Sequence, residues 1–311
     1  MKSCISTYSF ERLYQDGGFT RFNAIDKTKE YGCQGVELVL DDKTPDGSTP
    51  VEYAKALYAH AKEQGLEVPI YTTGANFFVK EPEKELERLC RHIDIAAECK
   101  IPLLRHDVAW GYYEGYTGIK SYKKVIEAVA PFVRQAAEYA RERGVKTCSE
   151  NHGYLLQDSA RMLELFAAVD HPNYGFLCDM GNFTVVDEDC ATAVSALSDY
   201  IVHVHAKDML VRSGMNFDPG RGYNLSRGGN YWRGTIFGHG NVPTFQILSA
   251  IRKSGYDGYV SLEFEGMEPV LEGVEIGTQN LQHMIKVIGE GKLTCPVCIG
   301  GTGICMIFLS A

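Results

Sequence analysis

Short apolar segments of strand-like composition alternate along this chain with longer segments in which apolar residues recur every three or four positions. The short segments are typical of buried strands and the long ones of amphipathic helices, and their regular alternation indicates βα units on a parallel sheet. Eight strands are predicted, at Lys2–Phe10, Gly35–Leu40, Leu66–Thr73, Ile101–Val108, Val145–Asn151, Tyr174–Met180, Ile201–Lys207 and Gly258–Glu265. Helices are predicted between them, among others at Pro50–Gln64, Pro82–Cys99, Tyr122–Arg143, Asp158–Val169, Pro243–Lys253 and Leu271–Ile288.

Glycines mark the junctions between several helical segments and the strands that follow them. Four of these glycines stand just past a helix end: Gly32, Gly65, Gly144 and Gly255. A glycine in this place readily takes the left-handed conformation that ends a helix. A doubly wound open sheet would need a glycine-rich phosphate loop after its first strand, and none follows Phe10. The pattern therefore favours one closed (β/α)8 TIM barrel, an α/β fold, which we place at residues 1–288.

Composition and charge exclude several classes of protein. The 311 residues are 45% hydrophobic and 23% charged, which is an ordinary globular composition. No apolar run approaches the roughly 20 residues that span a bilayer, and the first residues lack the apolar core of a signal peptide, so we expect a cytoplasmic protein without a membrane partner. The net charge of −9 disfavours nucleic acid, whose phosphates need a basic face. Ten cysteines in a chain of this size are expected to be reduced.

Carboxylates and imidazoles stand at the ends of the last four predicted strands. They are Glu150, His152, Asp179, His203, His205, Glu263 and Glu265. In a TIM barrel the carboxyl ends of the strands build the active site, and the two-residue repeat of a strand puts alternate residues on one face. Unpaired carboxylates so placed would repel one another in a partly dry mouth, so we expect a bound divalent cation. The alternative is a salt-bridged rim without metal.

Five segments carry a resemblance to a known family: Glu150-Asn151-His152, Cys178-Asp179-Met180-Gly181-Asn182, His203-Val204-His205-Ala206-Lys207-Asp208, Gly238-His239-Gly240 and Ser261-Leu262-Glu263-Phe264-Glu265-Gly266. Together they resemble the xylose isomerase-like TIM barrels, a family of sugar phosphate isomerases and epimerases that includes ketose 3-epimerases, inosose dehydratases and hydroxypyruvate isomerases. The resemblance extends over the whole predicted barrel. It implies that Glu150, Asp179, His205 and Glu263 are the ligands of one metal ion. It also implies that Glu150 and Glu263 act as bases on opposite faces of the substrate.

The implied ligands favour some metals over others. Three carboxylates and one imidazole form an oxygen-rich donor set, which suits Mn²⁺, Mg²⁺ or Co²⁺ better than the thiolate cages of structural Zn²⁺ do. Mn²⁺ is the first choice, with Mg²⁺, Co²⁺ and Zn²⁺ as alternatives. Open positions on the ion would take the vicinal oxygens of a hydroxy-ketone, and the ion would acidify the carbon-bound proton by stabilising an enediolate.

These features predict a divalent-metal-dependent sugar isomerase or epimerase that acts on a ketose or keto-sugar. The main alternative is a lyase or dehydratase, because an enolate can also expel a group beta to the carbonyl. Family members of that kind dehydrate keto-inositols or cleave 3-keto-glycosides and C-glycosides, and some pair with a small partner subunit. A non-catalytic binding subunit is a third hypothesis, which the intact ligand set disfavours. We expect a small-molecule sugar substrate and a homo-oligomer.

Further residues are candidates for catalysis or substrate binding. His152 shares a face with Glu150 and is either a general base or a hydrogen-bonding neighbour of the site. Arg105 either contacts the substrate or forms a buried ion pair with Glu150. The candidate substrate-binding residues are Arg105, His106, Trp110, Asn182, Lys207 and His239. The resembling family often has histidine where this chain has Asn182, and glutamate where it has His239.

Two segments lie outside the regular βα pattern. The connection 209–237 is long and glycine-rich and contains four arginines, so we expect a lid-like loop over the site or, alternatively, a subunit contact. The tail 289–311 carries Cys295, Cys298 and Cys305, which is one thiolate short of a closed zinc site. We expect this tail to be an appendage of unknown role.

Overall fold

Eight parallel strands form the core of the molecule. The computed structural model describes residues 1–15 and 17–291, and there the strands close into a barrel in the order β1-β11-β7-β6-β5-β4-β3-β2. Their bounds are β1 Lys2–Ser6, β2 Gly35–Val39, β3 Tyr71–Thr73, β4 Leu103–His106, β5 Lys146–Glu150, β6 Tyr174–Asp179, β7 Ile201–Ala206 and β11 Tyr259–Leu262. Every pairing around the barrel is parallel. The predicted (β/α)8 barrel is therefore confirmed.

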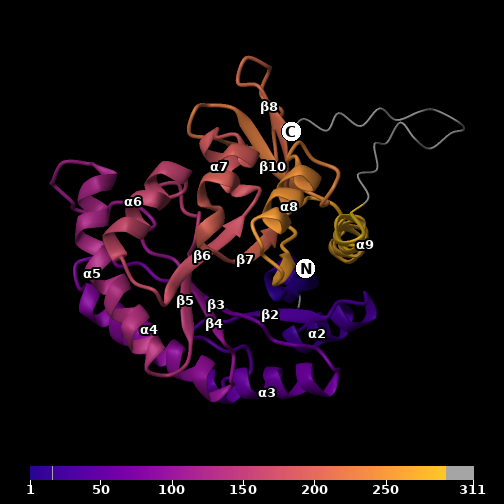
Figure 1. The fold of residues 1–311 in the computed structure, drawn as a ribbon, viewed down its shortest axis with the longest axis horizontal. Helices are drawn as coiled ribbons and strands as arrows, with labels where there is room; N and C mark the ends of the chain where they lie inside the picture. Colours follow the sequence, from indigo (N-terminus) through magenta and orange to yellow (C-terminus); the bar gives the residue numbers. More distant parts are fainter. Residues whose placement is uncertain (16, 292–311) are drawn as a thin grey trace, which may run out of the picture.

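Helices surround the barrel on its outer side (Figure 1). They are α1 Glu11–Tyr14, α2 Arg21–Glu30, α3 Pro50–Glu63, α4 Pro82–Glu98, α5 Tyr122–Arg141, α6 Ser159–Val169, α7 Cys190–Leu197, α8 Thr244–Lys253 and α9 Val270–Gly289. Each long helix buries one apolar stripe; in α5, Val125, Val129, Val133 and Ala140 are fully buried at helical spacing. Burial of such stripes against the strands holds the two layers together. The six helices named from the sequence are all present, with ends shifted by one or two residues.

Several strands are shorter than the apolar pattern indicates. The first stops at Ser6, whose hydroxyl accepts a hydrogen bond from the Tyr8 backbone and so starts the 3-10 helix η1 (Thr7–Phe10). The last stops at Leu262, and Glu263 follows it in the loop. The apolar pattern runs past these ends because the barrel mouth keeps the following residues buried, and burial alone does not mark where pairing stops.

The connection 209–237 contains regular structure, whereas its glycines suggested an irregular loop. Three strands form an antiparallel sheet that rises from one end of the barrel, near the label β8 in Figure 1. They are β8 Asp208–Arg212, β9 Asn224–Leu225 and β10 Tyr231–Thr235. We call residues 208–235 the extension.

The extension packs on loops at the carboxyl ends of the barrel strands. The Asp187 carboxylate accepts hydrogen bonds from the Ser226 hydroxyl at 2.6 Å and from the Asn230 amide at 2.7 Å. Arg227 pairs with Asp158, with 2.6 Å between Nη1 and Oδ2. These contacts join the turn between β9 and β10 to the loops that follow β5 and β6.

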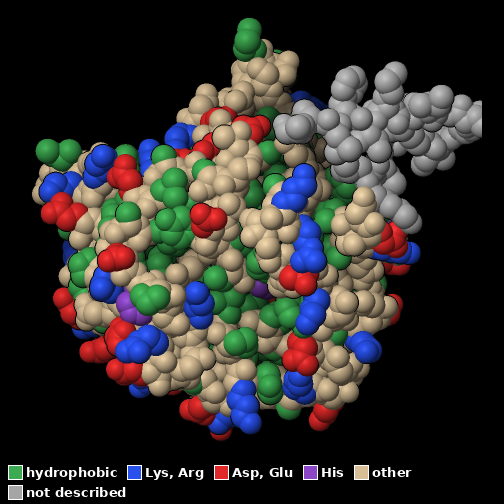
Figure 2. All heavy atoms as spheres, in the orientation of Figure 1, with side chains coloured by type: hydrophobic (Ala, Val, Ile, Leu, Met, Phe, Trp, Pro, Cys, Tyr) green, Lys and Arg blue, Asp and Glu red, His purple; other side chains and the backbone are tan. Residues whose placement is uncertain are grey.

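The tip of the extension exposes apolar side chains. Met215 and Phe217 are 97% and 94% exposed, and hydrophobic side chains are visible at the protruding top of Figure 2. Two exposed apolar side chains are normal on a protein surface and do not form a hydrophobic patch by themselves.

The end of the chain is only partly described. Helix α9 ends at Gly289, and residues 292–311, with Cys295, Cys298 and Cys305, lie outside the described residues, so the role of the tail stays a prediction. The seven cysteines of the described part are all free thiols. Within residues 1–15 and 17–291, no helix has both the length and the apolar character that a membrane crossing needs.

Candidate metal centre and active site

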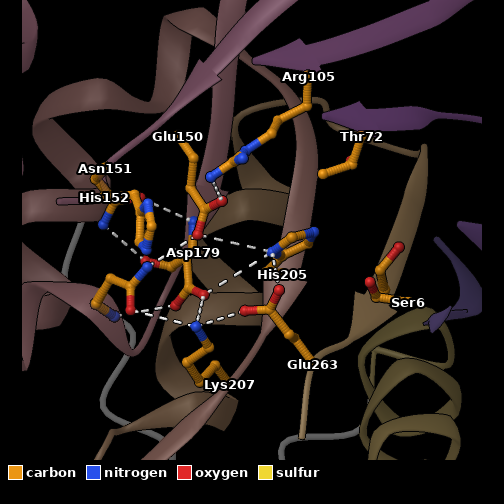
Figure 3. Close-up of polar contacts among 12 residues, drawn as sticks. Ser6, Thr72, Arg105, Glu150, Asn151, His152, Asp179, His205, Lys207 and Glu263 are labelled. Atoms are coloured by element: carbon orange, nitrogen blue, oxygen red, sulfur yellow. Dashed lines mark hydrogen bonds and ion pairs between the residues drawn. The ribbon is translucent and has the colours of Figure 1, made fainter. Parts of the chain in front are cut away.

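Four side chains converge at the carboxyl end of the barrel (Figure 3). They are Glu150 at the end of β5, Asp179 at the end of β6, His205 on β7 and Glu263 just after β11. One ligand atom from each lies within 4.8 Å of the others, and all four residues are buried. The His205 Nδ1 lies 3.5 Å from Glu263 Oε1, 3.8 Å from Glu150 Oε1 and 3.9 Å from Asp179 Oδ2. The structure thus brings together the four residues that the family resemblance implied.

Two atoms in this cluster are buried without a hydrogen bond, His205 Nδ1 and Asp179 Oδ2, although Asp179 Oδ2 forms an ion pair with Lys207. A buried polar atom without a hydrogen bond is costly, and folded proteins leave few of them. Three carboxylates and one imidazole nitrogen are donors that suit a divalent ion such as Mn²⁺ or Mg²⁺. The four residues therefore fit a divalent metal ion, and these two atoms are among its candidate ligands.

Glu37 on β2 holds His205 from the side away from the cluster. Its carboxylate oxygens lie 2.9 and 3.1 Å from His205 Nε2, and it also accepts a hydrogen bond from the Thr72 hydroxyl at 2.7 Å. Because a carboxylate only accepts, the neutral imidazole carries its proton on Nε2 and turns the Nδ1 lone pair toward the cluster. Sequence reasoning missed Glu37, although a charged residue within the apolar strand Gly35–Val39 was a signal.

Lys207 places a cation beside the carboxylates. Its Nζ lies 3.0 Å from Asp179 Oδ2 and 3.5 Å from Glu265 Oε2, and it contacts Glu263 Oε2 directly. Burial favours the neutral amine, but Asp179 and Glu263 raise the pKa of Lys207 well above its usual value. Gly181 lets this side chain approach, because a Cβ there would lie only 3.1 Å from Lys207 Cγ.

The charges in the cluster shift its pKa values in opposite directions. Burial raises the pKa of Asp179 to about 7, although Lys207 acts to lower it. Burial also acts to raise the pKa of Glu263, but Lys207 and His205 hold it at about 2. Burial disfavours a charged His205, yet the carboxylates around it raise its pKa well above its usual value. Anions crowded in this way favour the binding of a cation.

Two asparagines set the positions of ligand residues. The Asn151 side chain joins β5 to β6, because its Nδ2 donates to the Asp179 carbonyl at 2.9 Å and its Oδ1 accepts from the Asp179 backbone at 3.0 Å. Asn182 donates to Glu150 Oε1 at 2.8 Å and accepts from Lys207 at 3.3 Å. These bonds make Asn182 a support for the ligand residues.

Arg105 forms the buried ion pair that was the alternative to a substrate contact. Its Nη2 lies 2.6 Å from Glu150 Oε2 and 2.8 Å from Asp107 Oδ1, and its Nη1 donates to Asp107 Oδ2 at 3.0 Å. Burial acts to raise the pKa of Glu150, but Arg105 and His205 hold it well below its usual range. Because Asn182 binds the other oxygen of Glu150, both of its oxygens are occupied.

His152 reaches the open side of the site. Its Nδ1 lies 2.9 Å from Asp107 Oδ1, while 46% of the side chain is exposed. Burial disfavours the charged ring, but Asp107 raises the pKa of His152. The carboxylate fixes the proton of the neutral ring on Nδ1 and leaves Nε2 free to accept another. Sequence reasoning missed Asp107, whose position directly after β4 was a usable signal.

A cavity of about 310 Å³ opens over the cluster. We call it the inner cavity. The sequence-derived candidates that line it are Arg105, Trp110, Glu150, His152, Lys207 and Glu263. Tyr8, Asp107 and Glu265 also line it and were not among the candidates. No residue of the extension belongs to its lining, so the extension forms no wall of this cavity.

Three proposed substrate-binding residues do not line the inner cavity: His106, Asn182 and His239. Strand alternation separates His106 from its neighbour Arg105, and the buried His106 ring packs against Phe77 and Tyr174. His239 is exposed in the loop before α8. Substrate contact by these three residues therefore stays a prediction, and the lining of the inner cavity offers it no support.

Comparison with known proteins identifies the family. The model of the xylose isomerase-like TIM barrel family matches residues 25–287, and the chain belongs to this family.

Individual relatives catalyse different reactions. An inosose dehydratase of Lacticaseibacillus casei is 29% identical over 142 residues, which is 45% of this chain and 47% of that protein, so the match spans about half of each. Among solved structures, the probable 3-DHS dehydratase of Bacillus anthracis has a TM-score of 0.69 at 18% identity, covering 91% of this chain and 99% of the other. An L-ribulose 3-epimerase has a TM-score of 0.68 at 13% identity, covering 93% and 96%. At these identities the two structures show the fold alone.

Proposed function

We propose that this protein is a divalent-metal-dependent lyase that removes the proton next to the carbonyl group of a keto-sugar or keto-inositol, after which a group beta to that carbonyl leaves. The observation that carries the proposal is the pair of Asp107 and His152, an imidazole that is open to the inner cavity and oriented by a buried carboxylate. A metal ion held by the four-residue cluster would polarise the substrate carbonyl and so acidify the neighbouring carbon-bound proton.

His152 is a better base than either glutamate of the cluster. Arg105 and Asn182 occupy both oxygens of Glu150. Lys207 contacts Glu263 and holds its pKa at about 2 after burial has acted to raise it, so Glu263 is a weak base. By contrast, burial acts to lower the pKa of His152 but Asp107 raises it, so its free nitrogen accepts a proton more readily than either carboxylate.

Lys207 has a binding role in this proposal. Its ammonium group lines the inner cavity beside Glu263 and stays charged because the carboxylates raise its pKa. Its positive charge would attract a substrate oxygen and hold the reacting carbon near His152. Positioning of this kind contributes to the rate by keeping the reacting atoms close and aligned.

A ketose epimerase or isomerase is the second candidate. The observation in its favour is that Glu263 also lines the inner cavity, from a strand separated from β5 by β6 and β7. A proton taken by His152 on one side would then be returned from the side of Glu263. The occupied second oxygen of Glu263 makes this the weaker of the two candidates.

The test is turnover in D₂O with Mn²⁺ and three substrates: 3-keto-glucose, a keto-inositol and phenyl 3-keto-glucoside. We expect release of water or phenol, seen by NMR and mass spectrometry. Deuterium uptake without loss of a group would instead establish the epimerase or isomerase.

The base is tested in the same assay. His152→Gln should slow carbon-bound proton exchange by about two to four orders of magnitude. Mn²⁺ affinity should stay within about threefold, since His152 is not in the four-residue cluster. The matched control is His239→Gln, which changes an exposed histidine outside the cavity. Normal exchange in His152→Gln would show that another residue is the base.

A further inference from the structure

A second cavity adjoins the inner one. It has a volume of about 340 Å³ and is lined by residues from the loops after β2, β3 and β4 and from α4. Asp41, Gly74 and Trp110 line both cavities, so the two share a border. The proposed chemistry uses only the inner cavity, and this outer cavity has no role in it.

Trp110 forms the border between the two cavities. Its side chain is 59% exposed, an unusual state for so large an aromatic residue. The ring rests on Gly74, where a Cβ would lie 3.3 Å from Trp110 Cζ2. An indole supported by glycine on one side and open on the other offers a flat surface on which a ring can stack. The other tryptophan of the chain, Trp232, lies in the extension and lines neither cavity.

Polar groups surround this surface. Asp41 is exposed and makes no hydrogen bond or ion pair with any residue that the structure describes. Arg88 also lines the outer cavity and is held by ion pairs, 2.8 Å from Glu85 Oε1 and 3.2 Å from Asp42 Oδ2. An aromatic face with a free acceptor and a fixed donor beside it suits a ring that carries hydroxyl groups or a polar linkage.

We propose that the outer cavity binds a second ring linked to the reacting sugar, so that the substrate is a glycoside whose second ring stacks on Trp110. For the reaction, this proposal rests on the proposed function. For the class of substrate, it rests on the border that the two cavities share. A sugar beside His152 and Lys207 fills the inner cavity, and a substituent directed past Trp110 enters the outer one. The second ring is either another sugar or an aromatic group, since both stack on an indole.

The reaction would then separate the two rings. His152 takes the carbon-bound proton, the electron pair of that bond forms a carbon–carbon double bond, and the bond from the beta carbon to the linking oxygen breaks. The departing oxygen takes a proton from water at the outer cavity. The products are an unsaturated keto-sugar and the alcohol or phenol that carried the second ring.

Binding of unreactive glycosides tests the outer cavity separately from the chemistry. The full-length protein with Mn²⁺ is titrated by calorimetry with methyl β-D-glucoside, cellobiose and phenyl β-D-glucoside. We expect at least one of the two-ring probes to bind about three- to tenfold more tightly than the methyl glucoside, the usual worth of a stacked ring. A preference for cellobiose identifies a second sugar, and a preference for the phenyl probe identifies an aromatic group.

Variants of Trp110 locate the effect. Trp110→Ala should remove the preference for two rings, Trp110→Phe should retain most of it, and the matched control Trp232→Phe should leave it unchanged. Equal binding of all three probes by the native protein, or an unchanged preference in Trp110→Ala, overturns the proposal. A retained preference without release of phenol from phenyl 3-keto-glucoside would overturn the proposed reaction alone. Turnover without any preference for two rings would overturn the outer cavity alone.

Discussion

The two halves of the barrel mouth are built in opposite ways. In the half formed by β5, β6, β7 and β11, the four residues of the cluster are buried, and other side chains set their positions, as Glu37 does for His205 and Asn182 for Glu150. In the half formed by β1 to β4, Glu37, Arg105 and Asp107 are also buried, but above them Trp110 is exposed and Asp41 makes no hydrogen bond or ion pair with a described residue. Buried, fixed groups are what bond-breaking chemistry needs, whereas exposed groups adapt to a varied ligand.

Arg105 and Asp107 join the two halves. Arg105 lies on β4 and Asp107 directly follows that strand. Arg105 nevertheless reaches Glu150 at the end of β5, and Asp107 reaches His152 in the loop after β5. A ligand bound against the β4 loop therefore lies beside the residues that orient the candidate base. The comparison predicts that changes in the buried half are severe and that changes far from both cavities are mild.

The largest effect is expected for Asp179→Asn. Asparagine keeps the oxygen that accepts hydrogen bonds from the Gly181 and Asn182 backbones, at 2.8 and 3.0 Å, so the barrel should still fold. Loss of the charged ligand should abolish stoichiometric Mn²⁺ binding and turnover. Calorimetry and metal analysis measure this, with Glu265→Gln, outside the cluster, as the control that keeps its metal. Full metal content in Asp179→Asn would refute the ligand assignment.

Lys207→Met should chiefly lower the stability of the metal-free protein. Removing one partner of a buried ion pair typically costs about 3–5 kcal/mol, and here Asp179 and Glu263 would both lose their cation. Denaturant unfolding with and without Mn²⁺ measures the loss. The added ion should restore much of the stability, because it supplies positive charge to the same carboxylates. No loss of stability in the absence of metal would contradict this role for Lys207.

Glu37→Gln is expected to have an intermediate effect. A partner that orients a metal-bound histidine is usually worth about 10- to 100-fold in metal affinity, so Mn²⁺ binding should weaken by that factor. Thr72→Val is the matched control, since it removes the other hydrogen bond to Glu37 and leaves His205 in place. Nitrogen NMR of His205 in the metal-free variant gives a second readout, in which the pKa of His205 should fall, because burial lowers it and the charge of Glu37 that helps to raise it is gone. Equal effects of the two variants would show a merely structural role.

The smallest effect is expected at the tip of the extension. Replacing Met215 and Phe217 together by serine changes two side chains that are almost fully exposed, in a segment that lines neither cavity. Turnover and substrate affinity should stay within about twofold, as is usual for surface changes away from a site. A drop in both would support the predicted lid, and a changed assembly state in light scattering would indicate a subunit contact.

The periodicity of helices and strands predicted the barrel, and the rule that strand ends build the site pointed to the carboxylates and imidazoles at the last four strands. The resemblance to the family then implied which four of these residues hold the metal. Glu37 was missed because its role arises from contact with His205, 168 positions away along the chain. Asp107 was missed for the same reason, since its partner His152 is 45 positions away. A charged residue in an apolar strand and a carboxylate at a strand end were signals for these two residues, but one sequence does not show which partners they contact.

The extension shows a different limit of sequence reasoning. Strand β9 has only two residues, and glycines interrupt the segment around it, so no periodic signal marks the sheet. Its contacts with Asp158 and Asp187 are electrostatic and distant in sequence. His239 lies just beyond the extension. Because the sequence pattern did not indicate the sheet of the extension, it did not indicate the position of His239.

Closure of the barrel between β1 and β11 has a consequence for synthesis of the chain on the ribosome. β1 pairs with β2 on one edge and with β11 on the other, and the partners of Lys2–Ile5 are Tyr259–Leu262. At about 5–20 residues per second, the first strand is made roughly 13 to 50 s before its second neighbour exists. A nascent chain that stops short of Tyr259 therefore presents an unpaired strand edge, which other chains can pair with.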